Sequence, residues 1–123
     1  MQALSTREAA RQVGLTQDTV RWYERIGLLG RIPRGGDGRR KFGESDLAWL
    51  TLLTRLRATG MPVAQMLEYA ELVRSGSGEV DRLRLLEQHR ERTNHLRAEL
   101  DACTELLDTK IAIYRSRVAA ERS

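Results

Sequence analysis

The stretch that follows Gly78 constrains this 123-residue sequence most, because it contains neither glycine nor proline. Such a run predicts one uninterrupted helix over residues 79–118. At about 1.5 Å per residue, this helix is roughly 60 Å long. It is far longer than a single small core can cover, so its apolar residues need another partner.

Apolar residues recur along this helix at steps of three and four, close to the heptad spacing of a coiled coil. The chain has no second long helix to pair with them. We therefore predict that the partner is a second copy, which gives a homodimer through a two-stranded coiled coil. The predicted dimer seam comprises Leu96, Leu100, Cys103, Leu107, Ile111, Tyr114 and Val118.

The first 30 residues carry the signals of a helix-turn-helix. Ser5 followed by Glu8 predicts a capping box that opens a first helix, and Gly14 predicts its end. Thr16 can then cap a second helix over residues 17–26. Two short helices joined by a tight glycine turn are typical of DNA-binding helix-turn-helix units.

A basic segment follows over residues 31–42. Asp37-Gly38 is a strong hairpin turn signal, and the flanks can pair as a short two-stranded ribbon with Ile32 and Phe42 facing the core. Five basic residues and one acid lie within residues 31–41. A basic hairpin directly after a helix-turn-helix is typical of a wing.

Two further helices are expected, one opened by Glu44 and ended by Gly60, and one starting at Pro62. The predicted fold is mainly α, with a winged helix-turn-helix head and a long C-terminal dimerisation helix. The expected layout is a head over 1–74, a Ser-Gly hinge over 75–78, the dimerisation helix over 79–118 and a tail over 119–123.

The charge distribution separates the two halves. Residues 1–62 hold 11 Lys and Arg against 6 Asp and Glu, whereas residues 63–123 hold 10 against 11. A basic head on a neutral helical body favours double-stranded DNA as the partner. The competing interpretation is a coiled-coil protein-interaction scaffold whose basic head binds DNA without sequence preference.

Other classes of function find no support in the sequence. A single cysteine excludes a cysteine-rich zinc site, and His89 and His95 are six residues apart, which favours two surface residues over a metal pair. No catalytic set or phosphate loop stands out, so neither an enzyme nor a cofactor is expected. No apolar run approaches the length of a membrane span, and the expected location is the cytoplasm.

The candidate DNA contacts lie on the second helix and in the wing. Polar residues at the start of a recognition helix reach base edges, while arginines and hydroxyls bind phosphates. Of the adjacent rings Trp22 and Tyr23, we expect one to pack inward, and Tyr23 is favoured as the ring near DNA. The full predicted set is Thr16, Gln17, Thr19, Arg21, Tyr23, Arg34, Arg39, Arg40 and Lys41.

These segments together resemble the MerR family of bacterial regulators. The resemblance covers about the first 70 residues, in order and with short spacings. It runs through Ser5-Thr6-Arg7-Glu8-Ala9-Ala10, Gly14-Leu15-Thr16, Thr19 to Leu29, Asp37-Gly38-Arg39-Arg40-Lys41-Phe42, Asp46-Leu47 and Leu56 to Met61. The segment from Thr19 to Leu29 is highly specific.

The resemblance implies a homodimer with an antiparallel coiled coil. It also implies a palindromic operator that the dimer bends and untwists, so that RNA polymerase engages the promoter. Arg21 and Tyr23 match the family's helix contacts and Arg40 its wing arginine, whereas Arg39 replaces the usual aromatic residue. Metal-sensing members carry cysteines that this chain lacks. Cys103 is either a packed seam residue, which we favour, or a thiol sensor like those of members linked to aldehyde or oxidative stress.

Overall fold

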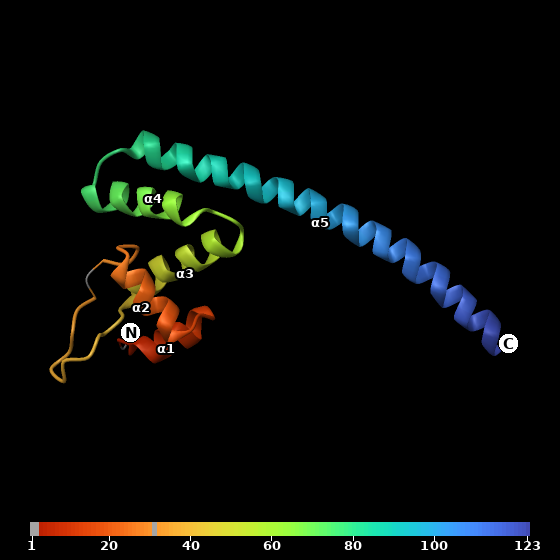
Figure 1. Cartoon of the computed structure of the whole chain (residues 1–123), viewed down its shortest axis with the longest axis horizontal. Helices are drawn as coiled ribbons and strands as arrows, with labels where there is room; N and C mark the ends of the chain where they lie inside the picture. Colours follow the sequence, from red (N-terminus) through yellow and green to blue (C-terminus); the bar gives the residue numbers. More distant parts are fainter. Residues whose placement is uncertain (1–2, 31) are drawn as a thin grey trace. The chain divides into compact units, whose positions relative to one another are not determined.

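The computed structural model describes residues 3–30 and 32–123, and five helices make up its regular structure. They are α1 (Thr6–Val13), α2 (Gln17–Arg25), α3 (Glu44–Ala58), α4 (Val63–Ser75) and α5 (Glu79–Arg122) (Figure 1). The chain divides into two compact units, residues 1–86 and 87–123. The first unit contains the head predicted over 1–74 and the start of α5, and we call this whole unit the head from here on. Within the described residues, no helix is both long and apolar enough to cross a membrane.

The caps that were predicted from the sequence set the helix-turn-helix. The Ser5 hydroxyl accepts a hydrogen bond from the Glu8 N–H, and the Glu8 carboxylate accepts one from the Ser5 N–H. Gly14 ends α1 in the left-handed conformation at φ 78°, which costs glycine no side-chain clash. The Thr16 hydroxyl accepts from the Thr19 N–H and opens α2. These predictions are confirmed.

A single apolar core joins the helices of the head. α1 packs on α2 and α3, and α3 packs on α4. Trp49 of α3 donates its indole N–H to the Leu28 carbonyl at 2.8 Å and stacks on Tyr69 of α4. These contacts hold the end of α2 against the later helices. The largest fully buried side chains are Tyr23, Phe42, Leu28, Leu50, Leu53, Met61, Met66 and Val20.

The burial of Tyr23 corrects one expectation. Its ring is 2% exposed, so Tyr23 is the inward ring, and the preference for it as the DNA-facing ring was wrong. Val20 lies three residues earlier on the same helix face and is also buried. Trp22 is only partly buried against the core. Burial raises the pKa of the Tyr23 hydroxyl.

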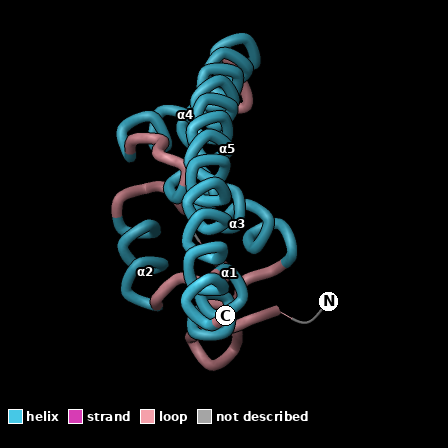
Figure 2. The backbone as a smooth tube through the Cα atoms, turned by 90° about the vertical axis from the view of Figure 1, so that its right-hand side faces the viewer, coloured by secondary structure: helices cyan, strands magenta, loops and turns pink. Residues whose placement is uncertain are grey.

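The wing corrects another expectation, because its arms form no ribbon in the described residues. The wing is drawn as loop in Figure 2. Its arms pair at one isolated bridge, Arg34 with Arg40, while Phe42 pairs with Leu4 in a second bridge. Pro33 lacks an N–H, and two glycines follow in the same arm, so this arm is a poor strand. Ile32 and Phe42 are buried as predicted, and Arg31 lies outside the described residues.

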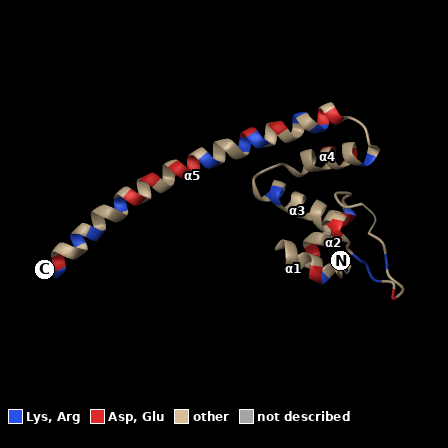
Figure 3. Cartoon of the chain, turned by 180° about the vertical axis from the view of Figure 1, so that it is seen from behind, with Lys and Arg blue, Asp and Glu red and all other residues tan. Residues whose placement is uncertain are grey.

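The helix α5 starts where expected but runs to Arg122, so residues 119–122, assigned to a tail, are helical. Lys and Arg (blue) and Asp and Glu (red) are interspersed along it (Figure 3). His89 is 5% exposed, so it is not the surface residue that we expected. Its Nδ1 lies 2.8 Å from Arg92 Nη1. Burial and the positive charge of Arg92 lower the pKa of His89.

Candidate nucleic-acid interface

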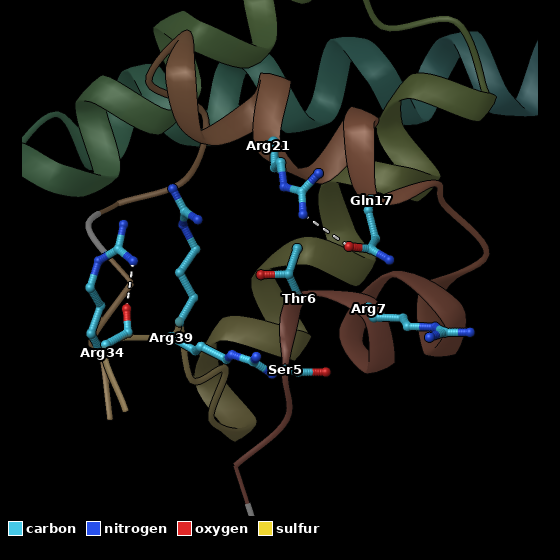
Figure 4. A pocket seen from close by; sticks show the side chains of 9 residues that line it. Ser5, Thr6, Arg7, Gln17, Arg21, Arg34 and Arg39 are labelled. Atoms are coloured by element: carbon cyan, nitrogen blue, oxygen red, sulfur yellow. Dashed lines mark hydrogen bonds between the residues drawn. The ribbon is translucent and has the colours of Figure 1, made fainter. Parts of the chain in front are cut away.

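A groove of about 480 Å³ opens on the head between the first two helices and the wing. Figure 4 shows Arg21 and Gln17 of α2 above Thr6 of α1, with Arg34 and Arg39 of the wing beside them. Five arginines and no acidic residue line the groove, so it favours a polyanion. The lining residues are Ser5, Thr6, Arg7, Gln17, Arg21, Arg34, Gly38, Arg39 and Arg40.

The N-terminal ends of α1 and α2 also line the groove. Thr6 is the first residue of α1, Gln17 is the first residue of α2, and both line the groove. A helix N-terminus carries a partial positive charge and N–H groups that suit phosphate oxygens. The arginines and the helix ends therefore add up to one positively charged surface.

Local contacts orient the cations of the groove. Arg21 donates to the Gln17 side-chain carbonyl at 3.1 Å, and Arg34 donates to the Gly38 carbonyl at 2.8 Å. The second bond ties Arg34 across the wing turn. The turn itself is held by Asp37, whose carboxylate accepts from the Arg39 N–H at 3.0 Å. This hydrogen bond lowers the pKa of Asp37. Arg39 itself is exposed.

Arg40 differs from the other cations because its acidic partner is close and partly buried with it. Its Nε lies 2.8 and 2.9 Å from the two carboxylate oxygens of Glu24 in α2, and its Nη2 lies 2.8 Å from Oε1. Both side chains are less than a third exposed. These hydrogen bonds raise the pKa of Arg40. The wing is thus fastened to α2 by a bidentate ion pair.

The groove gathers part of the predicted DNA-binding set. Gln17, Arg21, Arg34, Arg39 and Arg40 line it. The others lie outside its lining: Thr16 and Thr19 bond to each other, Tyr23 is buried, and Lys41 pairs with Asp37 at 3.7 Å.

The predicted DNA-binding set lacks the residues at the start of α1 that line the groove, namely the N-cap Ser5 with Thr6 and Arg7. The Ser5 cap predicts that Arg7 lies in the first turn of α1. No local pattern predicts that this turn lies beside the wing.

The seam residues of α5 are exposed on the single chain. The exposed fraction is 67% for Leu100, 55% for Leu107, 45% for Ile111 and 57% for Tyr114, and Cys103 is exposed as well. An exposed apolar row of this length is typical of an interaction surface. Among the described residues, no group of three metal-binding side chains comes together.

Comparison with known proteins identifies the family. Residues 4–71 match the family model of the MerR HTH family regulatory proteins, which covers more than half of the chain. An uncharacterised HTH-type transcriptional regulator of Haemophilus influenzae is 34% identical over 116 residues, which are 94% of this chain and 86% of that protein.

Two crystal structures agree with this assignment. HiNmlR, a MerR family regulator lacking the sensor domain and bound to promoter DNA, shares 34% identity and a TM-score of 0.85, with 95% of this chain and 94% of that chain covered. A MerR family transcriptional regulator from Listeria monocytogenes shares 34% identity and a TM-score of 0.76, with 97% and 91% covered. The chain therefore belongs to the MerR family of helix-turn-helix regulatory proteins, which are DNA-binding transcription regulators and not enzymes.

Proposed function

We propose that this regulator binds a palindromic promoter operator as a homodimer, in the cytoplasm, and bends and untwists the DNA so that RNA polymerase engages the promoter. The arginine-lined groove between α2 and the wing is the observation that carries the proposal. HiNmlR, which resembles this chain over nearly its whole length, has been crystallised with promoter DNA.

The dimer is proposed to be antiparallel. In that orientation, the apolar row of each α5 pairs with the apolar row of the second copy. This pairing buries the apolar row of both copies at once. It also places the two heads apart, where each can meet one half of a palindrome.

Binding to operator and to random DNA at several salt concentrations tests the function. Each phosphate contact contributes about 0.9 to the slope of log K against log salt. We expect a steep slope on both DNAs and binding to the operator that is tighter by about a thousandfold or more. Equal affinity for both DNAs would support the scaffold interpretation, in which the head has no sequence preference.

Cys103 is proposed to be a packing residue of the seam and not a sensor. Cys103 lies on the apolar row between Leu100 and Leu107, where a thiol packs as a small apolar side chain. The test is the promoter response to aldehydes and oxidants in Cys103→Ser. A folded, dimeric variant that loses a response shown by the wild type would make Cys103 the sensor.

A further inference from the structure

The ion pair between Glu24 and Arg40 has an orientation that matters for DNA binding. The guanidinium offers Glu24 its Nε and Nη2 edge, with three contacts of 2.8 to 2.9 Å. Nη1 carries two more N–H groups in the same plane, on another edge of the guanidinium. Fixing one edge of a planar guanidinium fixes the direction of the other edge.

The residues that line the neighbouring hollows show where Arg40 and Glu24 lie relative to the groove. Arg40 lines the arginine-rich groove, and Glu24 is not among the lining residues of that groove. Glu24 instead lines a neighbouring hollow of about 360 Å³, which Arg34 and Arg40 line as well. Arg40 thus borders both hollows, whereas the Glu24 carboxylate borders only the one outside the groove.

Glu24, as an acid beside the groove, has two opposing effects on DNA binding. Its negative charge repels a phosphate backbone, which weakens binding. Its hydrogen bonds restrain a long side chain that otherwise loses much rotamer freedom when it binds. The carboxylate is 23% exposed and lies directly against a cation. Because the positive charge of Arg40 screens much of the repulsion between Glu24 and a phosphate, we expect the favourable restraint of Arg40 to outweigh that repulsion.

We propose that Glu24 is a positioning residue for DNA binding. It holds Arg40 so that Nη1 is directed toward a backbone phosphate, and it fixes the wing to the recognition helix α2. The inference rests on the proposed DNA binding. It assigns a favourable role to an acid in a surface that binds a polyanion.

The test compares Glu24→Gln with Asp18→Asn in operator binding at several salt concentrations. Asp18 is a matched control, because it is an acid of the same helix whose side chain is 96% exposed and lies 3.7 Å from Arg21. If the negative charge were the only effect of these acids, its removal would tighten DNA binding in both variants. We expect Glu24→Gln to weaken binding about tenfold, the loss typical for a charge-assisted hydrogen bond, and Asp18→Asn to leave it unchanged or tighter.

A second arm separates positioning from folding. Glu24→Asp keeps the charge but shortens the side chain by one methylene, so it too is expected to weaken binding while its thermal unfolding stays close to wild type. In an Arg40→Ala background, Glu24→Gln is expected to have no further effect, because its partner is gone.

The outcomes are distinct. Glu24→Gln that binds as tightly as wild type or tighter overturns the inference, and so does an equal loss with and without Arg40. Unaltered binding by Glu24→Asp overturns it even if Glu24→Gln fails to fold. A wild type that shows no salt-dependent binding to DNA refutes the proposed function itself.

Discussion

Truncating Leu107 tests the dimer seam directly. Leu107 is 55% exposed on the single chain, so over half of its side chain remains to be covered by a partner. Full burial of a leucine side chain stabilises by about 1.5–3 kcal/mol, which gives about 1–1.5 kcal/mol for this fraction. A homodimer contains two Leu107 side chains, so Leu107→Ala should reduce the free energy of dimerisation by about 2–3 kcal/mol. Since about 1.4 kcal/mol is tenfold, the dimer dissociation constant should rise roughly 100-fold.

Leu106 supplies the matched control. It is the same residue type, is 70% exposed, and lies about 100° around the helix from Leu107. Leu106→Ala removes the same atoms off the seam, so its effect should stay below about threefold in the dissociation constant. Sedimentation equilibrium over a range of protein concentrations measures both variants. If Leu106→Ala weakens the dimer as much as Leu107→Ala, the seam is assigned to the wrong face.

Three further predictions concern the head and the buried histidine. Arg39→Ala should weaken operator binding by about 1–3 kcal/mol and lower the salt slope by about 1 per head; an unchanged slope would exclude a phosphate contact. Phe42→Ala removes a side chain that is 1% exposed and should cost about 3–5 kcal/mol of unfolding free energy, measured by urea titration. The pKa of His89 is lowered by burial and by Arg92, so the fold favours the neutral ring. Its contribution to stability is therefore complete above about pH 6.5 and is lost as the pH falls below that value through the lowered pKa. The urea midpoint of His89→Gln should accordingly change less between about pH 7 and pH 5 than that of the wild type, and an equal change in both would contradict this role.

The features that the sequence predicts well are local ones. The capping box of Ser5 and Glu8, the left-handed Gly14 and the Thr16 cap each depend on residues within a few positions. Their chemistry is complete before any tertiary contact forms. The heptad-like row of α5 is local in the same sense, since helical spacing alone places its members on one face.

The mistakes concern features that depend on distant contacts. Trp22 and Tyr23 are adjacent rings, and only the position of the core decides which one is buried; Val20, three residues before Tyr23, was the available signal. The wing arms were expected to pair as a ribbon, but Pro33 and the glycines after it weaken one arm. The place of Arg7 beside the wing arginines likewise depends on how α1 packs, which no local pattern encodes.

In the proposed homodimer, dimerisation and DNA binding are coupled through the number of arginine contacts. One head brings five arginines to its groove, and a dimer brings two such sets joined by α5. Once the first head is bound, the second acts at an effective concentration on the order of millimolar, which a free monomer at micromolar concentration does not reach. Leu107→Ala should therefore bind operator like wild type at protein concentrations above its dimer dissociation constant, with the same salt slope. Below that concentration, it should bind weakly and with about half the slope, because only one set of arginines meets the backbone. A slope that stays the same at every protein concentration would mean that the heads reach DNA without the seam.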